Sequence, residues 1–132
     1  MAEPAPGEPA TGEPADELAR QELAPAELAL RVLMPSFRGT TLPAEWARLL
    51  REGLGSICLF GSNTADGLDA VGRLVRDIHA VRPETVVCID EEGGDVTRLH
   101  AEDGSPVLGA AALGAAADLD LTRASGAAVG AD

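Results

Sequence analysis

Short apolar segments alternate with helix-patterned segments along most of this sequence. SICLF at 56–60 and TVVCI at 85–89 are unbroken apolar runs, which are typical of strands covered on both faces. RVLMP at 31–35 is a shorter strand candidate. Three strands separated by helices predict parallel βαβ units, in either a doubly wound sheet or a (β/α) barrel. The periodicity alone does not choose between these two architectures.

The segments between the strands carry the spacing of helices. The segment 43–52 precedes the second strand candidate. A longer helix follows that strand, and we expect Thr64 to cap its start and Pro83 to mark its end, because proline cannot continue a helix. The segment 119–129 predicts one more helix.

The charge of the chain argues against two classes of partner. The 10 basic and 22 acidic residues give a net charge of −12, so the chain lacks the basic surface that nucleic-acid binding requires. No apolar run approaches the roughly 20 residues of a membrane span, and the first residues do not have the pattern of a secretory signal. We therefore expect a cytoplasmic protein with neither a nucleic-acid nor a membrane partner.

The first 24 residues differ from the rest in composition. They are rich in alanine, proline and acidic residues, and the sequence GEPA occurs at 7–10 and again at 12–15. A low-complexity segment of this kind has little to bury, so its folding would not recover the conformational entropy that ordering costs. The sequence predicts a disordered acidic tail over residues 1–24 and a folded unit over residues 25–132.

Several familiar motifs are missing from the sequence. There is no lysine, hence no Walker loop, and no G-x-G-x-x-G follows a strand, so we expect no nucleotide or other cofactor. No G-x-S-x-G nucleophile motif occurs either. Cys58 and Cys88 lie within apolar runs and are expected to be buried thiols rather than a disulfide or zinc ligands. His79 and His100 are expected to be ordinary surface or helix-end histidines.

The densest group of reactive side chains follows the strand candidate at 85–89. Its acidic members are Asp90, Glu91, Glu92 and Asp95. From the residues alone, three interpretations are open: a solvated acidic loop, a hard-cation site, or a ligand site in which Asp90 accepts hydrogen bonds from sugar hydroxyls. The spacing of the acids does not match a calcium loop. The adjacent glycines Gly93 and Gly94 would let the loop turn tightly beside a ligand.

Three segments, in order, resemble glycoside hydrolase family 3. IDEEGGDVTRL at 89–99 resembles the signature loop of the family, MPSFRGT at 34–40 its first strand and following loop, and GLGSICLFGSN at 53–63 its second strand. Within the family, the resemblance is to bacterial β-N-acetylhexosaminidases with a single barrel. The resemblance implies an α/β fold in which the parallel (β/α) units of residues 25–132 form the first part of an incomplete TIM barrel. A complete barrel takes about 250 residues.

The same resemblance implies roles for residues of the loop. Asp90 matches the family aspartate that binds hydroxyls of the terminal sugar, so it is the expected substrate-binding residue. The residues expected to support the loop are Glu92, Gly93, Gly94 and Arg98, with Glu92 and Arg98 as a pair. Asp95 stands where the family pattern has arginine, which reverses a charge beside the expected sugar site.

The activity that the resemblance implies is retaining hydrolysis of terminal β-linked N-acetylglucosamine by a full-length enzyme. In the family, the nucleophile and the acid/base residues come later in the chain. We therefore expect residues 1–132 to be an inactive N-terminal fragment with no catalytic residue and no metal. Its expected partners are a β-linked amino-sugar glycan and the remainder of the barrel. The alternatives are a non-catalytic module that binds a sugar or a cation, and a split-barrel subunit that needs a partner chain.

Overall fold

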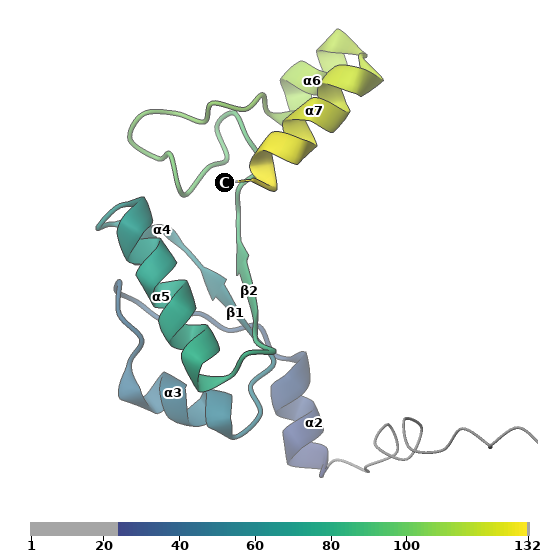
Figure 1. The fold of residues 1–132 in the computed structure, drawn as a ribbon. Helices are drawn as coiled ribbons and strands as arrows, with labels where there is room; N and C mark the ends of the chain where they lie inside the picture. The colour runs from purple at the N-terminus through teal and green to yellow at the C-terminus, as the bar shows by residue number, and fades with distance from the viewer. Residues whose placement is uncertain (1–23, 132) are drawn as a thin grey trace, which may run out of the picture.

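A computed structural model of the protein describes residues 24–131 (Figure 1). Its helices are α2 (Pro25–Val32), α3 (Ala44–Arg51), α4 (Gly61–Thr64), α5 (Leu68–Val81), α6 (Ala110–Ala116) and α7 (Leu119–Val129). Its strands are β1 (Ser56–Leu59) and β2 (Val86–Ile89). The tail predicted over residues 1–24 lies outside the described residues, apart from Ala24.

The two strands form a parallel pair that is connected through a helix. Ser56 pairs with Val86 and Leu59 with Ile89, and α5 connects the end of β1 to the start of β2. Ile57 and Leu59 are almost fully buried, and they belong to one hydrophobic cluster with Leu74 and Ile78 of α5. The predicted βαβ unit is therefore present, with its core between the strands and α5.

The prediction of a strand at 31–35 is wrong. Proline at the first helical position and the ion pair between Glu27 and Arg31 favour a helix, and α2 continues as far as Val32. Only a short extended segment remains before Pro35, whose carbonyl accepts a hydrogen bond from the Cys58 backbone N–H at 3.0 Å. This segment runs beside β1 without forming a regular ladder.

Two details around the strands also differ from expectation. Thr64 does not cap α5, because it is the last residue of α4 and its hydroxyl donates to the Gly61 carbonyl; Gly67 precedes α5 instead. The second strand is not covered on both faces, since Val86 is 55% exposed. Within the described residues β2 is an edge strand of a two-stranded sheet, which explains its exposure.

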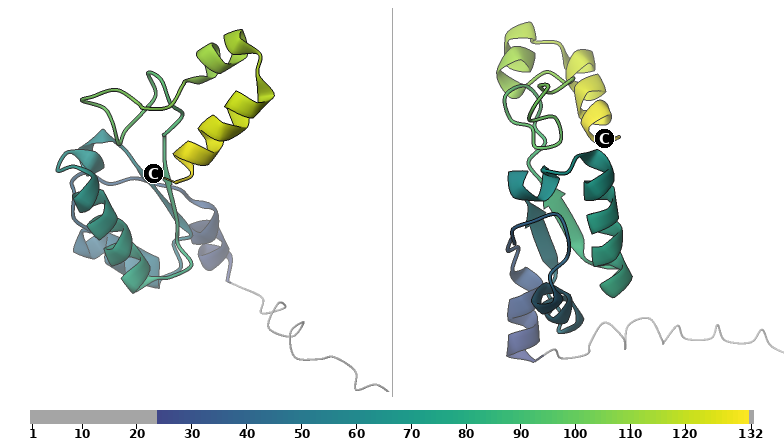
Figure 2. Two further views of the ribbon diagram at one scale, coloured as in Figure 1. Left: turned by 45° about the horizontal axis from the view of Figure 1, so that its top comes forward. Right: turned by 90° about the vertical axis from the view of Figure 1, so that its left-hand side faces the viewer.

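The last helices form a pair beyond the carboxyl end of β2. The helix predicted at 119–129 is confirmed as α7, and it begins at Asp118, whose carboxylate caps the N–H groups of Asp120 and Leu121. α6 precedes it and was not predicted. Both helices lie beyond the carboxyl end of β2, whereas α2 and α3 lie near the opposite end of the sheet (Figure 2). The chain between β2 and α6 is a loop, as predicted for its first residues.

Candidate functional site

The residues that follow β1 and β2 lie at the same edge of the sheet. Because Leu59 pairs with Ile89 in parallel register, Phe60 and Asp90 are the next residues on neighbouring strands. After β1 the chain enters α4, and after β2 it enters the long loop that leads to α6 (Figure 1). Ligand sites of parallel α/β proteins lie at the carboxyl ends of the strands. This edge is therefore the candidate site.

Asp90 and Arg98 form an ion pair at this edge. Arg98 Nη2 donates to Asp90 Oδ2 at 3.3 Å, and the Asp90 side chain is 44% exposed. A half-exposed pair of this kind contributes little to folding stability. It does hold the Asp90 carboxylate in place while leaving it accessible to a ligand, and such a carboxylate can accept hydrogen bonds from hydroxyl groups.

Glu91 binds the far end of the same loop. Its Oε2 accepts hydrogen bonds from the backbone N–H groups of Arg98 at 2.9 Å and Leu99 at 3.0 Å. Partial burial opposes ionisation of Glu91, but bonds from the Thr97 hydroxyl and from these two N–H groups outweigh it, with a smaller contribution from His100. The pKa of the Glu91 carboxyl therefore lies below its ordinary value.

Gly93 and Gly94 both have positive φ, at 82° and 60°, which L side chains rarely adopt. They pack against the backbone that precedes α6. A Cβ atom on Gly93 would lie 2.7 Å from the Leu108 carbonyl oxygen, and the Gly94 N–H donates to the Val107 carbonyl at 2.8 Å. The glycine pair thus allows the loop to contact the chain at 107–109.

Asn63 anchors the other half of the edge. Its side chain is completely buried, and Oδ1 accepts a hydrogen bond from the Phe60 N–H at 2.8 Å. Its Nδ2 donates to the carbonyl oxygens of Phe37 at 3.1 Å and Gly39 at 2.7 Å. Asn63 therefore joins the turn after β1 to the segment before α3, and it has a structural role.

Two comparisons with known proteins identify the family. No protein-family model matches the sequence. The chain is 32% identical over 93 residues to a beta-hexosaminidase of Shewanella frigidimarina, in a match covering 69% of this chain and 27% of that protein. It is also similar in structure to a glycoside hydrolase family 3 beta-N-acetylglucosaminidase of Paenibacillus sp. str. FPU-7, at a TM-score of 0.65 and 30% identity.

The chain belongs to glycoside hydrolase family 3. The structural match covers 75% of this chain and 20% of the Paenibacillus protein. The chain thus spans about a quarter and about a fifth of the lengths of the two relatives.

Two of the predicted site residues, Asp90 and Arg98, lie side by side in the structure. Asp90 lies at the carboxyl end of β2, and Arg98 lies beside it. Glu92 is exposed, and Arg98 pairs with Asp90 rather than with Glu92. The acid that holds the loop backbone is Glu91, which was not among the predicted site residues. A run of adjacent acids does not show which member turns inward, so no signal in the sequence could have found it.

A hollow of about 510 Å³, with both polar and apolar lining, lies next to the loop of residues 89–99. On one side it is lined by Gly61 and Thr64 of α4 and by the turn that leads from α4 into α5. On the other side lie Arg98, His100 and the residues that follow them, up to Asp103. The hollow therefore joins the two halves of the candidate edge, and Arg98 borders both it and Asp90.

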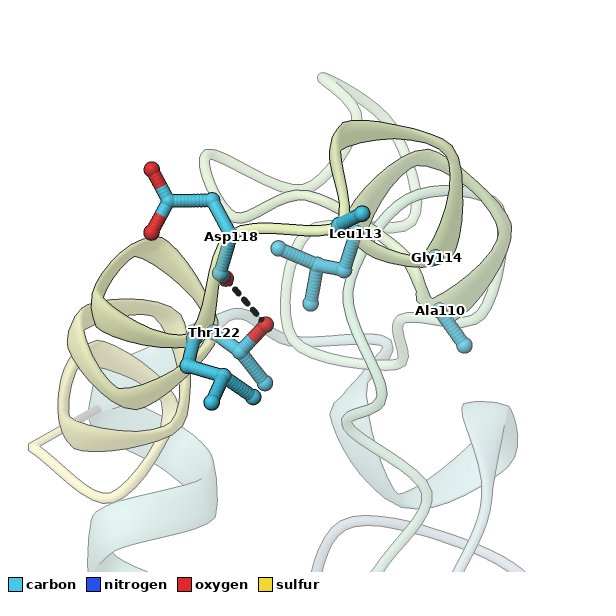
Figure 3. A pocket seen from close by; sticks show the side chains of 7 residues that line it. Ala110, Leu113, Gly114, Asp118 and Thr122 are labelled. Carbon is cyan, nitrogen blue, oxygen red and sulfur yellow. Dashed lines mark hydrogen bonds between the residues drawn. The ribbon is translucent and has the colours of Figure 1, made fainter.

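A second hollow, of about 520 Å³, lies between α6 and α7 (Figure 3). Small and apolar side chains, including Ala110 and Leu113, line most of it. Its one carboxylate, that of Asp118, points away from Leu113 and caps α7, and the Asp118 carbonyl accepts a bond from the Thr122 hydroxyl at 2.8 Å. The Asp118 carboxylate and the Thr122 hydroxyl thus form hydrogen bonds within the first turn of α7.

The described part of the chain contains no metal-binding cluster and no membrane-crossing helix. Between residues 24 and 131, no three side chains of His, Cys, Asp or Glu are grouped so that they could hold a metal ion. No helix in this range combines the length and apolarity that a membrane crossing needs.

His79 lies at the end of α5 with Nε2 3.1 Å from the Thr85 carbonyl oxygen, so it connects the helix to the start of β2.

Proposed function

We propose that this chain forms the part of a family 3 β-N-acetylglucosaminidase that holds the terminal sugar of a glycan. The observation that carries the proposal is the Asp90 carboxylate, which stands at the carboxyl end of a parallel strand, accessible and fixed by Arg98. The names of the two relatives support an N-acetylhexosamine as the sugar. The substrate class is therefore a glycan that ends in β-linked N-acetylglucosamine.

In this proposal Asp90 binds sugar hydroxyls and does no covalent chemistry. A hydrogen bond to a charged group contributes roughly 1.5–3 kcal/mol, so one or two such bonds can orient a sugar ring. Retaining hydrolysis needs a nucleophilic carboxylate and a separate proton donor. We place both of these groups outside residues 24–131. Asp90 would accelerate the reaction by holding the anomeric carbon in line with the nucleophile.

We also propose that β1 and β2 are neighbouring strands of a (β/α)8 barrel. The parallel register, the helical crossover and the loop at the carboxyl end of β2 all fit this architecture. An apolar groove of about 410 Å³ lies along the outer side of β2 and α5, with Val71, Val75 and Val87 among its lining. The rest of the barrel would cover this groove and pair with the edge of β2.

It follows that residues 1–132 alone would not hydrolyse a glycoside. Two short parallel strands with an open edge are only a small part of a barrel. In addition, retaining hydrolysis needs a nucleophilic carboxylate, which we place outside residues 24–131. Steady turnover of a chromogenic N-acetylglucosaminide by the purified chain would contradict this part of the proposal.

The test of the sugar-binding role uses the intact enzyme that contains this chain. Asp90→Ala should lower kcat/KM for a chromogenic β-N-acetylglucosaminide by roughly 10²- to 10⁴-fold, which corresponds to the loss of one or two charged hydrogen bonds. Asp77→Ala is the control, because Asp77 is an exposed acid on α5 and lies outside the loop. Its kcat/KM should stay within about threefold of the wild-type value. A loss below threefold for Asp90→Ala would remove Asp90 from the site.

A further inference from the structure

We infer that Glu91 is a positioning residue of the sugar site: its carboxylate fixes the backbone at Arg98, and Arg98 in turn fixes Asp90. This inference rests on the proposed function, since it assigns Glu91 a role in the binding of the same sugar.

Three donors converge on the Glu91 carboxylate. They are the backbone N–H groups of Arg98 and Leu99, at 2.9 and 3.0 Å from Oε2, and the Thr97 hydroxyl. Thr97 is itself buried, and its oxygen accepts a hydrogen bond from the His100 N–H at 3.0 Å. One carboxylate therefore orders four consecutive residues, 97–100, by direct bonds or through Thr97. Hydrogen bonds to a charged acceptor are about twice as strong as bonds between neutral groups.

These bonds close the base of the loop. The inner part of the loop is closed by the Glu92 N–H, which donates to the Val96 carbonyl at 2.9 Å, and by the bridge between Gly93 and Val96. That inner turn fixes the loop tip but does not reach Arg98. Glu91 is the residue that connects the chain leaving β2 with the chain arriving at Arg98.

Closure at this point determines where the Arg98 side chain can lie. Asp90 directly precedes Glu91, and Arg98 is the residue whose N–H Glu91 accepts. The Glu91 side chain therefore holds the Arg98 backbone close to the residue that follows Asp90. From there the Arg98 guanidinium reaches Asp90 Oδ2 at 3.3 Å. Because that ion pair is half exposed, its own attraction is too weak to fix the loop. The hydrogen bonds to Glu91 fix the backbone of Arg98 and Leu99, which the ion pair alone does not do.

We expect Glu91→Ala and Glu91→Gln to differ in their effect on the closure of the loop. A glutamine amide oxygen can accept the same backbone N–H bonds, although as weaker neutral bonds, so Glu91→Gln should keep part of the closure, whereas Glu91→Ala should remove it. Asp95→Ala serves as the control for the exchange measurement, because Asp95 is an exposed acid of the same loop. We expect the melting temperatures of all three variants to stay within about 4 °C of wild type, because the bonds order one loop and not the hydrophobic core.

The first measurement is amide hydrogen exchange in the intact enzyme without ligand. Glu91→Ala should speed exchange of the Arg98 and Leu99 amides by about tenfold or more, Glu91→Gln should have a smaller effect, and Asp95→Ala should change it by less than about threefold. Unchanged exchange in Glu91→Ala would overturn the closure, whatever the enzyme's substrate. This readout therefore does not depend on the proposed function.

The second measurement is kcat/KM for the chromogenic substrate in the same variants, with Asp90→Ala in parallel. Glu91→Ala should lower kcat/KM by about tenfold or more, and Glu91→Gln should restore it to within about threefold of wild type. Faster exchange in Glu91→Ala with unchanged kcat/KM would overturn the positioning role and leave a purely structural one. If Asp90→Ala is also fully active, the proposed function itself fails, and the exchange data still decide whether the closure exists.

Discussion

The Arg98 guanidinium and the Asp90 carboxylate meet at 3.3 Å across a loop of seven intervening residues, at the carboxyl end of β2. Neither side chain is buried, so the pair resembles a surface salt bridge in energy. Its position gives it a different significance, because Asp90 is the residue proposed to hold the sugar. An arginine beside a ligand-binding carboxylate limits the orientations which that carboxylate can take.

The first prediction concerns Arg98→Ala. We expect the substitution to lower the free energy of unfolding by less than about 1 kcal/mol, because the ion pair is half exposed. We expect kcat/KM of the intact enzyme to fall by roughly 10- to 100-fold, because Asp90 loses the partner that orients it. Arg123→Ala is the control, since Arg123 forms an exposed ion pair with Asp120 on α7. Equal kinetic effects of the two substitutions would contradict the role of Arg98.

The repeating elements of the fold could be predicted because they depend on periodicity. The apolar runs at 56–60 and 85–89 correspond to β1 and β2, and the helix at 119–129 corresponds to α7. Where periodicity was weak, prediction failed. The run at 31–35 is apolar but too close to the end of α2 to form a strand. The sequence of α6, AAALGAA, consists mainly of small residues and shows no amphipathic pattern.

The details of the site could be predicted only in part. The position of Asp90 at a strand end follows from the pattern of its strand. The choice of Glu91 rather than Glu92 as the acid that holds the loop depends on the left-handed turn at Gly93 and Gly94, which no periodicity encodes. The sequence shows Asn63 only as a polar residue after a strand. Its burial depends on hydrogen bonds to carbonyl groups more than 20 residues away in sequence, which the local pattern does not predict.

The second prediction compares two glycines with nearly equal φ. Gly93 has φ 82° and Gly104 has φ 84°, so alanine suffers the same left-handed strain at either position, about 1–2 kcal/mol. Only at Gly93 would the added Cβ meet backbone, at 2.7 Å from the Leu108 oxygen, whereas nothing lies within 4 Å at Gly104. Gly93→Ala should therefore destabilise the protein more than Gly104→Ala in urea unfolding. Equal losses would mean that the 107–109 segment moves away without cost.

The third prediction concerns Asn63→Ala. The substitution leaves the Phe60 N–H and two carbonyl groups without their partner in a fully buried position. We expect a loss of about 2–4 kcal/mol in the free energy of unfolding, measured by urea denaturation. Ser62→Ala, at the exposed neighbouring position of the same short helix, should change it by less than about 0.5 kcal/mol. A small effect of Asn63→Ala would show that water replaces the amide.

The last prediction concerns Cys58 and Cys88, which are register partners on β1 and β2. Neighbouring strands lie about 4.7–4.9 Å apart, which is within the Cα separation that a disulfide allows. Both thiols are free and partly exposed, so the prediction that they are buried is wrong. Burial, followed by the charge of Asp90, raises the pKa of the Cys58 thiol above its ordinary value, while Arg98 opposes this.

We therefore expect diamide to convert the two thiols into one disulfide within the chain, with diamide reduced to the hydrazine. The reaction should be slow at pH 7 and faster at pH 9, because the attacking thiolate is scarce below the raised pKa of Cys58. Peptide mapping without reductant should recover the peptides of Cys58 and Cys88 linked, and Cys88→Ser should abolish that link. If both cysteines of the oxidant-treated wild-type protein remain open to alkylation, the strand register does not bring the two sulfur atoms within bonding distance.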